Sequence, residues 1–93
     1  MQKNRCGAFR TGRLVATSGV LDAIPQNELI RGVARHIRGD WGEVCGEDQQ
    51  RNDEALKCGE RLLSAYHSAA GIKFWVITEA DRSATTVLLP SEY

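Results

Sequence analysis

The sequence predicts an α+β fold made of a short N-terminal strand, two to three helices and a C-terminal three-stranded antiparallel meander that forms one small sheet. Three observations predict it. A β-branched and apolar run follows a glycine near the N-terminus, apolar residues recur at helical spacing through the middle of the chain, and the last third alternates with a period of two. The chain has 93 residues, 42% of them hydrophobic and 26% charged, which is the size of one domain with a modest core.

The first strand is expected over residues 12–17, GRLVAT, and a short helix over residues 19–24. Thr17 or Ser18 can cap that helix, because a side-chain oxygen just before a helix accepts a hydrogen bond from one of its free amides. Pro25 would end it, since proline lacks the amide hydrogen that a continuing helix needs.

A longer helix is expected over residues 27–38, NELIRGVARHIR, with Asn27 as its cap and Gly39 just beyond its end. Gly32 weakens the interior of this helix by about 1 kcal/mol relative to alanine and so indicates a close neighbour. The apolar residues recur at helical spacing, which predicts a buried stripe made of Leu29, Ile30, Val33 and Ile37.

The rest of the chain has the pattern of a loop, a helix and three strands. Residues 39–46 contain three glycines and form the loop, and a surface helix with acidic residues in its first turn follows over residues 47–58. The connections between the predicted strands are short, so consecutive strands are expected to pair as antiparallel neighbours. A period of two places these strands at residues 61–68, 72–79 and 84–90.

Charge is unevenly distributed along the chain, although the formal net charge is zero. Residues 1–39 carry seven basic and two acidic side chains, whereas residues 40–93 carry five basic and ten acidic ones. Such asymmetry can mark a polyanion-binding face or a self-complementary surface, and it disappears when the two halves interleave in the fold. Residues 1–11 are expected to form a basic, flexible extension of a single domain that spans residues 12–93.

The sequence contains no predicted membrane segment or metal-binding motif. No apolar run approaches the roughly 18 residues of a membrane span, and the basic N-terminus lacks the apolar segment of a signal peptide. We therefore expect a cytoplasmic protein without membrane contact. The three cysteines (Cys6, Cys45 and Cys58) match no zinc-binding pattern, so we expect reduced thiols, no metal site and no cofactor.

The end of the chain carries the most specific motif, WVITEADRSATTVLLPSEY, residues 75–93. Together with GRLVATSGVLDAI and ARHIRGDWGE, it resembles an uncharacterised family of small bacterial proteins often labelled "plasmid-related protein", which are found on plasmids and other mobile elements. The resemblance covers residues 12–93. It implies a mobile-element setting and carries no mechanism, because the family has no established activity.

A charged cluster lies between the last two predicted strands and contains Glu79, Asp81, Arg82 and Ser83. Two carboxylates beside an arginine could perform acid–base chemistry or bind a metal together with a phosphate. The same residues also suit a turn, because aspartate and serine side chains accept hydrogen bonds from nearby backbone amides. The turn is the favoured interpretation, and the margin over a binding site is the narrowest in the chain.

A second candidate site lies where the long helix runs into the glycine-rich loop, at His36, Asp40 and Trp41. A histidine, a carboxylate and an aromatic ring could form a ligand pocket, or a general base with its orienting group. In the favoured alternative, the histidine interacts with the dipole at the helix end while the tryptophan packs at the edge of the core.

One face of the same helix predicts a candidate nucleic-acid patch formed by Arg31, Arg35 and Arg38. Together with basic residues near the N-terminus, these side chains could bind phosphates. A neutral net charge and the absence of interleaved aromatic residues favour an ordinary solvated arginine face instead.

We expect a small non-enzymatic accessory or interaction protein of a mobile element, which acts through an unknown protein partner or through self-association. The alternative is a small nuclease toxin or another nucleic-acid-binding protein. Its support is the predicted order of strand, two helices and three strands, which is similar to that of small ribosome-dependent endoribonuclease toxins, although fold alone does not imply function.

Overall fold

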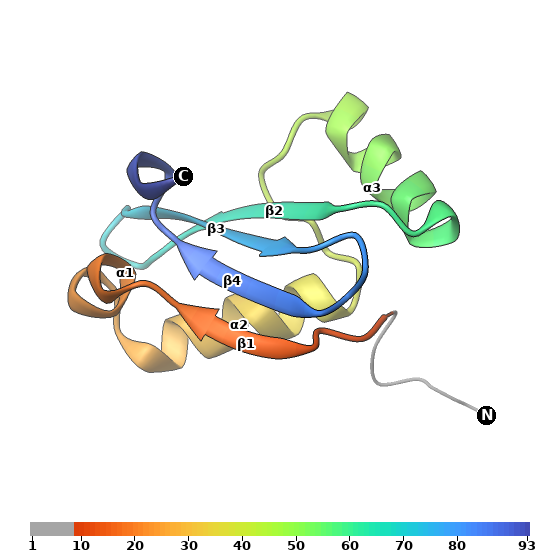
Figure 1. Cartoon of the computed structure of the whole chain (residues 1–93). Helices are drawn as coiled ribbons and strands as arrows, with labels where there is room; N and C mark the ends of the chain where they lie inside the picture. Colours follow the sequence, from red (N-terminus) through yellow and green to blue (C-terminus); the bar gives the residue numbers. More distant parts are fainter. Residues whose placement is uncertain (1–8) are drawn as a thin grey trace.

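The computed structural model describes residues 9–93, which contain three α-helices and a four-stranded mixed sheet. The predicted α+β class is therefore confirmed (Figure 1). The elements follow in the order β1 (Arg13–Ala16), α1 (Ser18–Ala23), α2 (Gln26–Ile37), α3 (Gly46–Cys58), β2 (Leu62–His67), β3 (Lys73–Thr78), β4 (Ala84–Leu88) and the short 3₁₀ helix η1 (Pro90–Glu92). Most of the predicted extension, residues 1–8, lies outside the described residues.

The strand order in the sheet is β1-β4-β3-β2. The last three strands pair as antiparallel neighbours, and β1 lies parallel to β4. The predicted sheet of three antiparallel strands is wrong on this point, because β1 extends it to a mixed sheet of four. The reason is the backbone of the N-terminal strand, whose amides at Arg13 and Thr17 donate to the carbonyls of Ser83 and Val87 at 3.0 and 3.1 Å.

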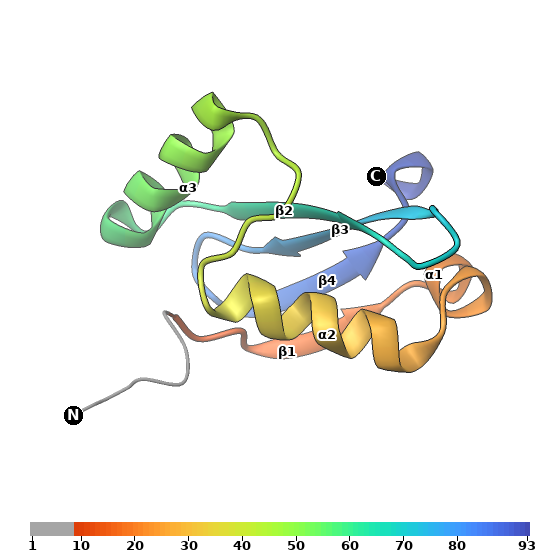
Figure 2. The same cartoon turned by 180° about the vertical axis from the view of Figure 1, so that it is seen from behind.

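Helix α2 covers one face of the sheet (Figure 2). It approaches β3 closely at Gly32, where an added Cβ would lie 2.8 Å from the ring of Phe74. The neighbour expected from that glycine is thus an aromatic ring of the core. The core on this face consists of Val20, Ile24, Leu29, Tyr66, Phe74, Val76 and Val87.

The predicted buried stripe of α2 is only partly confirmed, because Val33 and Ile37 are only half-buried. Leu29, Gly32 and His36 are its buried residues, whereas Ile30 is 61% exposed. Positions separated by three and four residues share a helix face, so the close approach at the glycine turns the next face, with Ile30, toward solvent. A glycine and a histidine are therefore the fully buried neighbours of Leu29 on this helix.

The opposite face of the sheet is partly covered by the C-terminal segment. The ring of Tyr93 meets Trp75 of β3 edge-on, with centroids 5.7 Å apart. The guanidinium of Arg61 lies over the same tyrosine ring, 5.5 Å from its centroid. Figure 1 shows η1 on this side and α2 on the other.

The two edges of the sheet are treated differently. At the β2 edge, the side chain of Asn52 in α3 bonds both backbone groups of Leu63, at 2.8 and 3.2 Å. Ala65 then bonds the backbone of Trp41 and Glu43 at 3.1 and 2.7 Å. Side-chain and loop contacts therefore cover this edge.

The β1 edge is open within residues 9–93. The amides of Arg13 and Thr17 face β4, so alternation along the strand turns the backbone groups of Leu14 and Ala16 away from the sheet. All four residues of β1 are exposed, and no described residue pairs with this edge.

We predict that Gly32→Ala lowers the free energy of unfolding by about 1–3 kcal/mol, because the new methyl group overlaps the buried Phe74 ring and outweighs the better helix propensity of alanine. Urea unfolding followed by circular dichroism measures the change. Gly46→Ala is the matched control, since nothing lies within 4 Å of its Cβ position, and it should leave stability unchanged or raise it by up to about 1 kcal/mol. A Gly32→Ala protein as stable as the native chain would show that α2 and β3 have room between them for a methyl group at this position.

Candidate functional site

The charged cluster between β3 and β4 forms a hydrogen-bonded turn. Asp81 accepts a hydrogen bond from the amide of Ser83 at 3.0 Å, and the amide of Arg82 donates to the carbonyl of Glu79 at 2.9 Å. Hydrogen bonds from Ser83 hold the pKa of the exposed Asp81 carboxyl below its usual value. Two of the candidate site residues therefore stabilise the backbone of the turn that carries them.

Arg82 occupies the left-handed region, with a φ of 61°. Its guanidinium donates to the carbonyls of Glu60 at 2.7 Å, Glu79 at 3.0 Å and Ala55 at 3.2 Å. Because the Ala55 carbonyl lies in the last turn of α3, the arginine satisfies a helix end and joins it to the β3–β4 turn. Within the described residues, its hydrogen bonds go to backbone carbonyls, so the predicted pair of carboxylates with an arginine is not assembled as a site.

The second candidate cluster is divided by the fold. His36 is completely buried, and its ring meets the buried ring of Trp41 edge-on at 5.6 Å. The indole nitrogen of Trp41 donates to Asp53 at 3.0 Å. Asp40 pairs instead with Arg35 on the surface, at 2.7 and 3.3 Å. The histidine and the tryptophan are thus brought together without the carboxylate.

The Arg35–Asp40 pair also changes the predicted nucleic-acid patch. The guanidinium is held by both oxygens of the carboxylate and lies 4.6 Å from the centroid of the Tyr66 ring. This hydrogen bonding holds the pKa of Asp40 below its usual value and that of Arg35 above it. Arg31 on α2 and Arg38 at the C-cap of α2 are exposed. The positive charge of Arg35, the central residue of the patch, is therefore balanced by the carboxylate of Asp40.

A chain of buried hydrogen bonds runs from β2 to the segment before β1. His36 lies between the hydroxyls of Ser64, 2.6 Å from Nδ1, and Thr78, 2.9 Å from Nε2. The hydroxyl of Thr78 is 2.7 Å from that of Thr85, which donates to the carbonyl of Thr11 at 2.8 Å. All four side chains have no exposed surface.

The direction of this chain follows from its end, because a carbonyl can only accept. Thr85 uses its hydrogen on Thr11, so it accepts from Thr78, and Thr78 in turn accepts from Nε2–H of His36. Nδ1 then lacks a hydrogen and accepts from Ser64. The histidine is therefore the neutral Nε2–H tautomer, with both ring nitrogens satisfied.

The electrostatic environment keeps His36 neutral. Burial, with a smaller contribution from the charge of Arg82, lowers the pKa of His36 to about 4. The ring of Phe9 meets His36 edge-on at 5.2 Å, and the guanidinium of Arg82 lies over that phenylalanine, 5.7 Å from its centroid. The ring of Phe9 therefore lies between Arg82 of the first candidate cluster and His36 of the second. The Ser64–His36 pair is inaccessible to a substrate.

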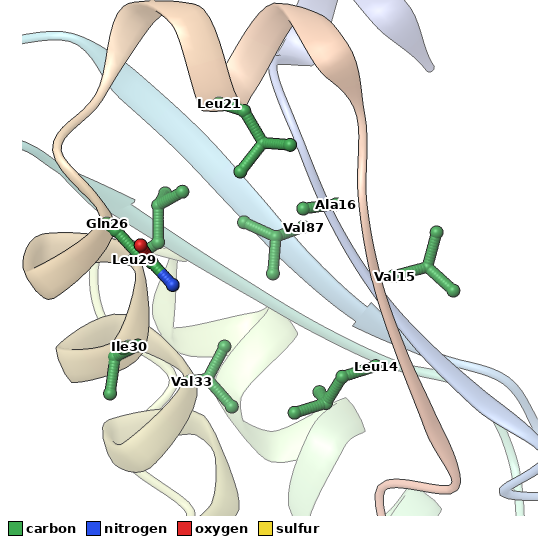
Figure 3. Close-up of a pocket in the computed structure, with 9 residues that line it drawn as sticks. All are labelled: Leu14, Val15, Ala16, Leu21, Gln26, Leu29, Ile30, Val33 and Val87. Atoms are coloured by element: carbon green, nitrogen blue, oxygen red, sulfur yellow. The ribbon is translucent and has the colours of Figure 1, made fainter.

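An apolar groove with a volume of about 260 Å³ lies between β1 and the helices α1 and α2 (Figure 3). Sequence reasoning missed it. The available signal was the apolar character of both faces of β1, together with Ile30, which the predicted helical stripe assigned to the core. The residues around the groove include Leu14, Ala16, Leu21, Ile30, Val33 and Val87.

Comparison of the chain with protein-family models, curated proteins and solved structures finds no match. Within residues 9–93, no three histidine, cysteine, aspartate or glutamate side chains are grouped as a metal site would require. No helix in the same part of the chain is both long and apolar enough to cross a membrane.

We predict that Arg82→Lys lowers the free energy of unfolding by about 1–3 kcal/mol, since a lysine cannot donate to the carbonyls of both the turn and the end of α3. Chemical denaturation measures the loss, and amide hydrogen exchange should show it as faster opening of the last turn of α3. Lys57→Arg, an exposed change on the same helix, should leave both quantities unaltered. Native stability in the Arg82→Lys protein would contradict the structural role given to this arginine.

We predict that stability falls as the pH decreases from about 6.5 to about 4, the window between the unfolded and folded pKa values of His36. In that window the unfolded chain binds a proton that the folded chain excludes, so the loss reaches about 3 kcal/mol at about 1.4 kcal/mol per pH unit. Urea unfolding across this range measures it.

Two variants separate titration from packing in this measurement. His36→Gln should flatten the pH dependence whatever its overall stability, whereas Thr78→Val should be less stable and keep the slope, because the histidine remains buried. An unchanged slope in His36→Gln would mean that other groups cause the pH dependence.

Proposed function

We propose that this chain is a small non-enzymatic interaction protein that binds another protein chain through the open edge of β1 and the apolar groove beside it. The observation that carries the proposal is the contrast between the two sheet edges. The β2 edge is covered by Asn52 and residues 41–43, whereas the backbone of Leu14 and Ala16 faces outward. Proteins ordinarily protect an exposed edge, because it offers hydrogen bonds to any passing strand.

The distribution of exposed apolar side chains supports the same surface. The large hydrophobic residues exposed within residues 9–93 are Leu14 at 57%, Val15 at 40%, Leu21 at 54%, Ile30 at 61% and Tyr93 at 64%. All but the tyrosine line the groove or its β1 wall. Single exposed apolar residues are common, but a cluster around a groove is typical of a surface that binds another protein.

The engagement of the candidate catalytic groups supports a function without chemistry. Arg82 and Asp81 hold backbone groups, Asp40 holds Arg35, and His36 is satisfied at both nitrogens. Catalysis needs groups that can reach a substrate, whereas each of these four side chains makes a structural contact within the protein. In the alternative function, nucleic-acid binding, only Arg31 and Arg38 of the predicted patch could contact phosphates, because Arg35 is paired with Asp40.

The setting that we propose is that of an accessory protein of a plasmid or another mobile element. Its support is the resemblance of residues 75–93 to the ending of the plasmid-related proteins. Arg82, in the charged part of that ending, joins the β3–β4 turn to the end of α3. The most specific part of the motif therefore has a structural role.

Site-specific photocrosslinking in living cells tests the interaction surface. We expect a photoreactive residue at Ile30 to give one discrete protein adduct, and the same residue at Gln50 on the exposed face of α3 to give none. Leu14→Asp, which charges the opposite wall of the groove, should abolish the adduct while the protein stays folded. Mass spectrometry identifies the adduct.

Equal labelling from the two positions would overturn the proposal. It would also fall if the purified protein bound RNA or DNA with steep salt dependence and lost that binding in Arg31→Ala and Arg38→Ala variants, since the nucleic-acid alternative would then account for the function.

A further inference from the structure

We infer that the open edge of β1 pairs with β1 of a second copy of this chain, antiparallel about a two-fold axis through Val15, so that one sheet continues through both copies. This inference rests on the proposed function and names the partner at the β1 edge. It is carried by the backbone pattern of β1, by the sizes of its side chains and by the charges at its two ends.

The backbone pattern is self-complementary. Leu14 and Ala16 present both their amide and their carbonyl to the open edge, whereas the neighbouring amides of Arg13 and Thr17 bond β4. In an antiparallel pair, residues that exchange both hydrogen bonds alternate with residues that exchange none. Leu14 opposite the partner's Ala16, and Ala16 opposite the partner's Leu14, therefore satisfy every outward group of the strand. Val15 then lies opposite the partner's Val15 in a pair without hydrogen bonds.

The side chains fit this register in size. Leu14 and Ala16 lie on the face of β1 that borders the groove, since their neighbours in β4 are Thr85 and Val87. Ala16 leaves space there, and the exposed Leu21 lies beside it in Figure 3. The partner's Leu14, placed opposite Ala16, would pack against Leu21, and this contact would remove apolar surface of both side chains from solvent. Two of the most exposed apolar side chains would thus bury one another.

The charges at the ends of the strand are complementary. The register places Arg13 opposite the partner's Thr17, on the face away from α2. The hydroxyl of Thr17 donates to the carboxylate of Glu92 at 2.6 Å, and this hydrogen bond holds the pKa of Glu92 below its usual value. Arg13 would therefore lie beside the partner's negatively charged Glu92, and the two-fold axis repeats this contact. Opposite charges across a strand pair are stabilising, whereas like charges repel.

These three features favour a second copy over an unrelated peptide. A peptide could pair with the backbone of β1. On the groove face, however, only a large apolar residue opposite Ala16 would fill the space, and at the end of the strand only a cation would pair with Glu92. This chain supplies both, at the right separation, in Leu14 and Arg13. The net charge of zero also removes the general repulsion that opposes self-association.

A charge exchange tests the register. Arg13→Glu and Glu92→Lys each place like charges at both contacts of a self-pair, so each variant alone should dimerise about tenfold or more weakly than the native chain. A mixture of the two variants places opposite charges at both contacts and should restore the dimer. Sedimentation velocity over a concentration series measures all three samples, and Arg51→Glu on α3 is the matched control that should dimerise like the native chain.

Circular dichroism of each variant establishes that it is folded, which matters for Glu92→Lys because Glu92 also accepts from the amide of Leu89 at 2.8 Å. Failure of the mixture of two folded variants to associate would overturn the inference.

Disulfide trapping provides a second test that leaves Glu92 intact. In a chain with Cys6→Ser, Cys45→Ser and Cys58→Ser, Val15→Cys should form a disulfide-linked dimer under mild oxidation, because opposite residues in a pair without hydrogen bonds have the closest Cβ atoms. Leu14→Cys and Ala16→Cys are matched controls on the same strand and should link more slowly. Faster linkage through either control would overturn the register with its axis at Val15.

The outcomes also separate this inference from the proposed function. A protein that stays monomeric at every concentration, while Ile30 still crosslinks to a different protein, would overturn the second copy as the partner and leave the interaction function standing. A monomer without any crosslinked partner would overturn both.

Discussion

The architecture depends on one histidine that is kept neutral. His36 donates to Thr78 and accepts from Ser64, so a single side chain of α2 is bonded to two strands at once. The hydroxyl chain then continues through Thr85 to the carbonyl of Thr11, which carries the connection across the sheet to the segment before β1. Each member has a partner, and a buried network of this kind is stable only when it is complete. The helix therefore has one position on the sheet.

That position determines which part of the sheet remains uncovered. Gly32 lies against rings from β2 and β3, and His36 bonds the same two strands, so α2 lies over the β2–β3 half. The other half of the same face, formed by β4 and β1, becomes the floor of the apolar groove. A single helix about 10 Å wide cannot cover four strands spaced about 4.8 Å apart. The groove is a consequence of a two-layer fold whose long helix lies over one half of the sheet.

The periodic elements were predictable from the sequence and the long-range contacts were not. The helix ending at Gly59 and the three C-terminal strands follow from local patterns, and Thr17 caps α1 as expected. The parallel pairing of β1 with β4 joins residues more than 60 positions apart, and no local pattern encodes it. The contacts of Arg82 are also long-range and could not be predicted from local pattern. A charged residue in a turn suggests a carboxylate partner, whereas its acceptors include backbone carbonyls at the end of α3. The groove was missed because helical periodicity assigned Ile30 to the core.

The place of β4 between β1 and β3 has a consequence for the order in which the fold can form during synthesis. β1 is among the first described residues to leave the ribosome, yet the strand beside it comprises residues 84–88. Arg82, which completes the end of α3, and Thr85, which completes the hydroxyl chain, arrive equally late. No nascent chain that lacks this segment can close the sheet or satisfy the buried histidine network. Folding of the domain therefore awaits its last strand, and β1 waits longest for a neighbour.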